Sequence, residues 1–84
     1  MKNPVPLCIA IIDALLVFET SAADEVDPDV AVRAMENMGS SLQKLDDEDQ
    51  RELRCLFYAI AERSAETGYG EFVKSVPDML GLQE

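Results

Sequence analysis

Histidine is missing from this sequence of 84 residues. Imidazole is the side chain whose unperturbed pKa lies nearest neutrality, and it serves in most catalytic triads and in many metal sites. Its absence removes the usual residue of triad, metal and imidazole mechanisms. Carboxylates are plentiful, but they gather where helices are expected to begin, and capping and solvation account for them there. We therefore expect no catalytic residue, no metal ligand, no cofactor and no enzymatic activity.

Positive charge is scarce. The chain carries 7 Lys and Arg residues against 17 Asp and Glu residues, which gives a formal net charge of -10. Such a surface repels nucleic acid phosphates and anionic lipid headgroups alike. We expect neither nucleic acid nor a membrane as a partner, and any charged partner is expected to be basic.

Cysteine and glycine are also sparse, with 2 and 4 residues. Cys8 and Cys55 lie in apolar runs without CxxC spacing or a neighbouring base, so we expect both to be reduced core residues. A disulfide or a reactive thiol is the alternative. No glycine-rich phosphate-binding loop is present, because Gly68-Tyr69-Gly70 is interpreted as a helix stop followed by a helix start.

The first apolar stretch, from Val5 to Phe18, is interpreted as a helix that is apolar almost all round. Lys2, this stretch and the small residues after Thr20 resemble a secretory signal, but a charge at Asp13 in the middle is unusual for one. Fourteen residues are too few to span a bilayer core, which needs about 20. We expect a structural helix in a cytoplasmic protein.

Two amphipathic helices follow. Asp27 as N-cap and Pro28 at the first helical position begin one of them, which is expected to end at Leu45. Gly39 inside it indicates close helix packing or a kink. The apolar side of this helix is expected to carry Val30, Ala34, Met38, Leu42 and Leu45. Asp46 is expected to cap the next helix, which continues to a left-handed glycine at Gly68 and buries Leu53, Leu56, Phe57, Ile60, Ala61 and Ser64.

The last segment, Gly70 to Leu80, is expected to be a helix that is kinked or broken near Pro77, because proline lacks a backbone donor. Strand-like alternation is absent throughout. With 48% hydrophobic and 29% charged residues, the composition is that of an ordinary globular domain. The sequence therefore predicts an all-α fold, a single acidic helical domain over residues 1–84 with four helices, short connections and antiparallel neighbours.

Two acidic clusters are the candidate partner-binding sites. The residues are Asp24, Glu25, Asp27 and Asp29 in the first cluster, and Asp46, Asp47, Glu48 and Asp49 in the second. Neither has the ligand spacing of an EF-hand calcium loop. Concentrated carboxylates steer a basic partner toward encounter, although an acidic surface can also serve solubility alone.

Two resemblances bear on function. Gly39-Ser40-Ser41-Leu42 is similar to the sequence around the prosthetic-group serine of acyl carrier proteins, which would make Ser41 the attachment point of phosphopantetheine. Ser40 stands where that family has aspartate. By size, charge and helix content alone, the chain also resembles the immunity proteins that neutralise bacterial nuclease toxins, whose carboxylates meet a basic enzyme surface.

The leading hypothesis is a non-enzymatic interaction module, an inhibitor or immunity-type protein that binds a basic partner through its acidic patches. The alternative is a structural homodimer without a charged ligand, and an acyl-carrier-like protein comes third. Self-association is expected through the first helix, because its apolar surface exceeds what a surface helix needs. If Asp13 points outward beside Ala10 and Val17, the exposed strip is small. If it points inward to Arg33 or Arg54, a large apolar patch faces outward.

Overall fold

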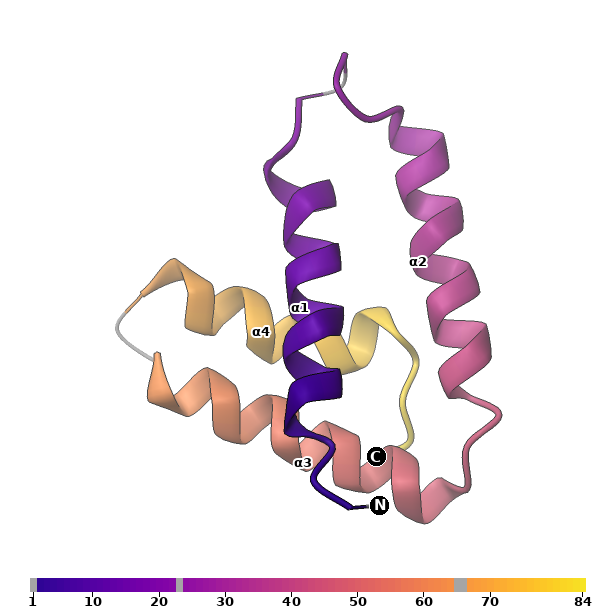
Figure 1. Ribbon diagram of the computed structural model, residues 1–84, viewed down its shortest axis with the longest axis vertical. Coiled ribbons are helices and arrows are strands. Elements are labelled where there is room, and N and C mark those ends of the chain that lie inside the picture. The colour runs from indigo at the N-terminus through magenta and orange to yellow at the C-terminus, as the bar shows by residue number, and fades with distance from the viewer. Residues whose placement is uncertain (1, 23, 65–66) are drawn as a thin grey trace.

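The computed structural model describes residues 2–22, 24–64 and 67–84, and within these ranges it contains four helices and no strand (Figure 1). The helices are α1 (Val5–Thr20), α2 (Pro28–Leu42), α3 (Asp47–Arg63) and α4 (Gly68–Met79). The predicted all-α fold is therefore confirmed. None of the described helices is long and apolar enough to cross a membrane.

The helices form two antiparallel pairs that cross each other. In Figure 1, α1 and α2 run in opposite directions and spread apart from the turn that joins them toward the lower end of α1, while α3 and α4 lie side by side across the lower half of α1. The C-terminal end of the chain lies against α3, where Arg51 donates a hydrogen bond to the Glu84 carbonyl at 3.0 Å. The short connections thus give antiparallel neighbours, as expected from the sequence.

Helix α2 begins as predicted. Pro28 is its first residue, and a carboxylate oxygen of Asp27 accepts a hydrogen bond from the Asp29 N–H at 2.8 Å. The predicted end was wrong, because α2 stops at Leu42 and the chain turns through residues 43 to 45.

The junctions on either side of α3 differ from the prediction in two ways. Asp46 occupies the N-cap position, but its side chain makes no capping hydrogen bond. The helix ends at Arg63, so Gly68 is not its left-handed stop and instead begins α4. The Thr67 hydroxyl caps α4, accepting from the Gly70 N–H at 3.4 Å. Among the described glycines, positive φ occurs at Gly81 (66°).

Pro77 lies inside α4, which continues to Met79 as one helix with only a minor kink. Proline lacks an N–H, so α4 loses the backbone hydrogen bond to the carbonyl four residues earlier. Its own ring is buried against the core.

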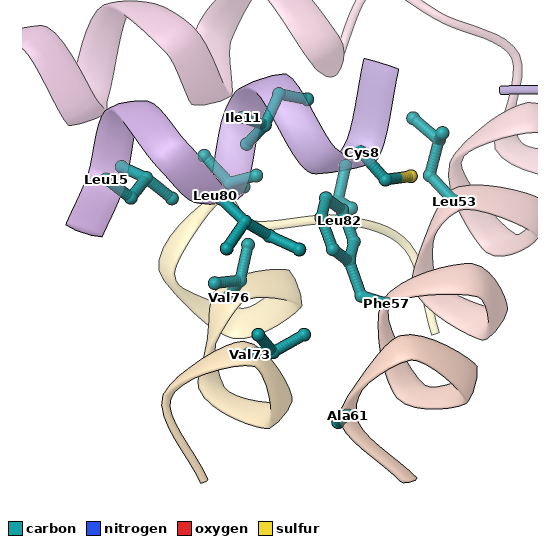
Figure 2. Packing of buried hydrophobic residues seen from close by; sticks show 11 residues of the cluster. Cys8, Ile11, Leu15, Leu53, Phe57, Ala61, Val73, Val76, Leu80 and Leu82 are labelled. Carbon is teal, nitrogen blue, oxygen red and sulfur yellow. The ribbon is translucent and has the colours of Figure 1, made fainter. Parts of the chain in front are cut away.

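The core joins α1 to the α3–α4 pair (Figure 2). Phe57 stands near its centre and is fully buried. Its neighbours in the buried cluster are Cys8, Ile11, Ile12, Leu15, Leu53, Ala61, Val73, Val76, Leu80 and Leu82. Figure 2 shows side chains of α1, α3 and α4 and of the C-terminal segment pointing toward one another.

Helix α2 lies at the edge of this core. Val30, predicted to be on its buried side, is 53% exposed, whereas Ala31 is buried. Of the other predicted core residues, Ala34, Met38, Leu42 and Leu45 are half-buried. Gly39 confirms the close-packing interpretation: a Cβ there would lie 2.8 Å from the Leu80 carbonyl oxygen. The side-chain amide of Gln43, the C-cap residue of α2, also donates a hydrogen bond to that oxygen at 2.9 Å, which joins the end of α2 to the end of α4.

Buried polar side chains of α3 hold the C-terminal segment. Gln50 donates to the carbonyls of Leu45 (2.8 Å) and Gln43 (3.1 Å), and its carbonyl oxygen accepts from the Gln83 N–H at 3.1 Å. One amide thus ties the α2–α3 turn to the last residues of the chain.

Arg54, 9% exposed, completes this attachment. Its guanidinium donates to the carbonyls of Leu82 (2.7 Å) and Gln83 (3.1 Å), to the Tyr58 hydroxyl (2.9 Å) and to Asp78 (3.1 Å). Burial disfavours the charged form, but the hydrogen bonds to Asp78 and Tyr58 outweigh it and hold the pKa of Arg54 above its ordinary value. Arg54 is therefore not the inward partner of Asp13, which is exposed.

Candidate functional site

The first acidic cluster occupies the turn between α1 and α2 and the first turn of α2. Asp24, Glu25, Asp27 and Asp29 are all exposed. Within the part of the chain that the structure describes, no ion pair joins them to a Lys or Arg side chain. Apart from the Asp27 cap, Glu25 accepts a hydrogen bond from the Ala22 N–H at 3.4 Å. These carboxylates are thus exposed to an incoming partner.

The second acidic cluster lies at the other end of α2. Asp47, Glu48 and Asp49 occupy the first turn of α3, where negative charge stabilises the helix dipole. Asp46 to Glu48 are exposed, and Asp49 is half-buried. A helix of 15 residues is about 22 Å long, so the structure keeps the two clusters apart by about that distance (Figure 1). A partner that contacts both must extend along α2.

An apolar groove adjoins the first cluster. It lies between the last turns of α1, the α1–α2 turn, the first half of α2 and α4, and its volume is about 270 Å³. Leu15 and Ala31 are its buried residues, and Phe18, Met35 and Phe72 are half-buried in it. Val32 and Met79 are 47% and 39% exposed at its margin.

The charges beside this groove are negative. Glu19 lines it directly, and Pro28, flanked by Asp27 and Asp29, lines its end. On α2, Asp29 and Glu36 lie three and four residues from Val32, hence on the same side of the helix. No Lys or Arg is among the described residues that line the groove. The site is an apolar groove with an acidic margin.

Sequence reasoning identified the carboxylates and missed the groove. Three helices build it, and α4 contributes Phe72 and Met79 from far along the chain. The sequence does carry one signal, since Met35 lies four residues from Ala31 on one side of α2. The spacing of these two residues does not indicate which other helix packs against that side of α2.

A larger hollow, of about 490 Å³, lies between α3 and α4. Tyr58, Glu62, Glu71 and Lys74 line it. All four side chains are exposed, so the charges remain solvated and of mixed sign. Its lining is polar to a greater extent than that of the groove beside α2.

The outer surface of α1 is a second apolar feature. Asp13 is exposed, with Ala10 exposed and Val17 53% exposed beside it, which is the outward arrangement considered from the sequence. Three further apolar side chains of α1 are also exposed, namely Val5, Leu7 and Ile9. The exposed strip is therefore wider than the residues beside Asp13 alone.

The two cysteines differ, which corrects the expectation that both lie in the core. Cys8 is fully buried, but Cys55 is exposed on α3, and both are free. Burial raises the pKa of the Cys8 thiol from 9.0 to about 11, and the Glu52 carboxylate adds to the shift. Cys8 is therefore protonated at neutral pH and is a packing residue.

Because the Cys8 thiol is buried, we expect the folded chain to lose stability at alkaline pH. Because the pKa of Cys8 is higher in the folded chain than in the unfolded chain, its contribution is fully present below pH 9 and is lost as the pH rises toward 11. We expect the folded chain to lose about 2 kcal/mol between pH 8 and pH 11 relative to Cys8→Val, at about 1.4 kcal/mol per pKa unit. Urea unfolding of both proteins across this range measures the difference. Parallel curves would contradict the prediction.

Ser41 does not have the location that the carrier resemblance implies. It is exposed at the next-to-last residue of α2, whereas the resemblance would place it at a helix start. We expect incubation with a phosphopantetheinyl transferase and coenzyme A to leave the intact mass unchanged. A mass increase that disappears in Ser41→Ala would contradict this.

Comparisons of the chain with protein families, with curated proteins and with solved structures gave no match. Any function must therefore be argued from the chain's own surface.

Proposed function

We propose that the protein is a non-enzymatic interaction module that binds a basic protein through its acidic surface, as an inhibitor or an immunity-type protein does. The observation that carries the proposal is the first acidic cluster, whose four exposed carboxylates have no Lys or Arg partner among the described residues and adjoin an apolar groove. Like charges gathered without neutralisation cost stability, and a basic partner relieves that repulsion.

The net charge supports the same partner class. Because the net charge of the chain is -10, long-range attraction accelerates its encounter with a cation-rich surface, and repulsion opposes its encounter with an acidic one. Rim charges of this kind affect the association rate and its salt dependence more than the dissociation rate. The second cluster, about 22 Å away along α2, adds to this long-range attraction but faces a different part of the partner.

The test is affinity capture from a lysate of the native host with three variants that each remove three negative charges. The first variant combines Asp24→Asn, Glu25→Gln and Asp29→Asn, which keeps Asp27 as the helix cap. The second changes Asp46, Asp47 and Glu48 to their amides. The control changes Asp13, Glu62 and Glu71, which are exposed elsewhere.

We expect the wild-type chain and the control to capture a protein of basic isoelectric point, and the first variant to lose it. The second variant is expected to slow association with little change in dissociation. Binding should weaken as salt is raised. Capture of an acidic partner, or equal capture by the first variant and the control, would refute the proposal.

A second candidate function is a structural homodimer, favoured by the exposed apolar side chains of α1. Leu7 and Val17 are 44% and 53% exposed, and Asp13 is the one charged residue between them. Association through this surface would bury apolar area that the α3–α4 pair leaves uncovered. Light scattering at micromolar concentration is expected to give twice the chain mass of 9.3 kDa, reverting to the monomer in Val17→Lys. A mass of 9.3 kDa that is unchanged on concentrating the wild type excludes it.

A further inference from the structure

The groove between α1, α2 and α4 restricts the kind of partner further than the net charge of the chain does. Phe18, Met35 and Phe72 are only half-buried there, and Val32 and Met79 are exposed. These side chains come from three helices and face a common hollow, so they form one apolar surface instead of scattered exposed residues. A partner that filled the hollow would bury them together.

Helices α1, α2 and α4 and the turn between α1 and α2 line the groove, so an inserted segment meets no sheet edge among the described residues. Backbone pairing by strand addition is thus not available to it. A helix satisfies its own backbone groups and can offer apolar side chains at three- and four-residue spacing to such a surface. Met35 and Met79 suit this role, because an unbranched thioether adapts to side chains of different shape.

The negative charges beside the groove restrict which helices can bind in it. Glu19 lines it, Asp27 and Asp29 stand at its end, and Glu36 follows Val32 along α2. Arg33 lies four residues from Asp29 and three from Glu36, hence beside both on α2, but it is not among the residues that line the groove. These carboxylates would repel an acidic helix. A helix with Lys or Arg beside its apolar stripe complements both features.

We propose that the groove binds an amphipathic helix with a basic polar face, supplied by the partner protein. This inference rests on the proposed function and adds to it the structural class of the partner segment. The apolar stripe of the helix lies against Met35 and Phe72, and its cations lie against Glu19, Asp29 and Glu36.

The probe is a synthetic peptide of about 15 residues, long enough to span about 22 Å as a helix. It carries leucine at three- and four-residue spacing and lysine on the other side. A scrambled peptide of the same composition has the same charge without the apolar stripe. Binding is measured by fluorescence anisotropy, and the contact by NMR of methyl-labelled methionine.

The variant is Val32→Asp, which places a carboxylate at the margin of the groove on an already exposed position. The control is Val30→Asp, which adds the same charge to the same helix at a residue that is 53% exposed and does not line the groove. Both variants are expected to fold, since neither side chain belongs to the core.

The amphipathic peptide is expected to bind at least about tenfold more tightly than the scrambled one, a difference of about one decade in Kd. Val32→Asp should remove that preference, and Val30→Asp should keep it. The methyl resonances of Met35 and Met79 should shift on binding, while that of Met38, which does not line the groove, should not.

Equal binding of the two peptides, with loss only in the Asp24, Glu25 and Asp29 amide variant, would overturn the groove inference and leave the proposed function standing. Binding of neither peptide would also overturn it, and the capture experiment would then decide the proposed function by itself. A preference that survives in Val32→Asp would place the helix elsewhere and refute the assignment.

Discussion

Gly70→Ala is expected to destabilise the fold by about 3 kcal/mol, at the upper end of the cost of overpacking. A Cβ at Gly70 would clash with the Ser64 carbonyl oxygen and would lie 2.9 Å from that of Ala61. Both are backbone atoms of the α3 terminus, so no side chain can rotate to make room. The start of α4 would have to move away from α3, and the core residues Val73 and Val76 would move with it.

Gly68→Ala is the matched control. It lies two residues earlier in the same helix, and a Cβ there meets no atom within 4 Å. Alanine is the better helix former by up to about 1 kcal/mol, so this variant should be unchanged or slightly more stable. Thermal unfolding is expected to show a fall of about 12 to 24 °C for Gly70→Ala, at about 4 to 8 °C per kcal/mol in a domain of this size. Equal unfolding temperatures would show that α3 and α4 are not packed this closely.

Arg54→Met is expected to lower the free energy of unfolding by about 3 kcal/mol, because it leaves the buried carbonyl of Leu82 and the part-buried carbonyl of Gln83 without their donor. Methionine keeps the apolar stem, so the loss reports the guanidinium itself. The C-terminal segment should detach, and its backbone amides should exchange faster with solvent. Hydrogen exchange together with urea unfolding measures both effects.

Asp78→Asn separates the carbonyl contacts from the ion pair. The Arg54–Asp78 pair is 3.1 Å long, but the Asp78 side chain is 73% exposed. A solvent-exposed carboxylate contributes no more than about 1 kcal/mol to such a pair. Asp78→Asn is therefore expected to cost less than about 1 kcal/mol. A loss as large as that of Arg54→Met would show that the ion pair, and not the attachment of the C-terminal segment, is what Arg54 supplies.

Local features of the sequence were sufficient to predict the helices and the start of α2. Apolar periodicity and the absence of strand-like alternation predicted the all-α fold, and Asp27-Pro28 predicted the cap and first residue of α2. These signals act through neighbours within one or two turns, so they need no knowledge of the fold. The same local reasoning misplaced the ends of α2 and α3, because glycine and aspartate occur in several kinds of turn between helices and do not by themselves mark where a helix ends.

The residues of each acidic cluster are close together in the chain, so they could be identified from the sequence. The distance between the two clusters could not be, because it depends on the length of α2 between them. The exposure of Cys55 and Val30 was missed for a related reason. An apolar run shows that a residue can be buried, but the number of neighbouring helices decides whether it is.

Only the tertiary structure revealed the groove and the attachment of the C-terminal segment. Phe18, Met35 and Phe72 come together because the joined ends of α1 and α2 meet α4, and Arg54 meets Leu82 because α3 and α4 run antiparallel. The sequence by itself determined an acidic protein of four helices with two concentrated negative patches. Which patch lies beside an apolar surface was decided by how those helices pack, since contacts between residues far apart in the chain leave no fixed spacing in the sequence.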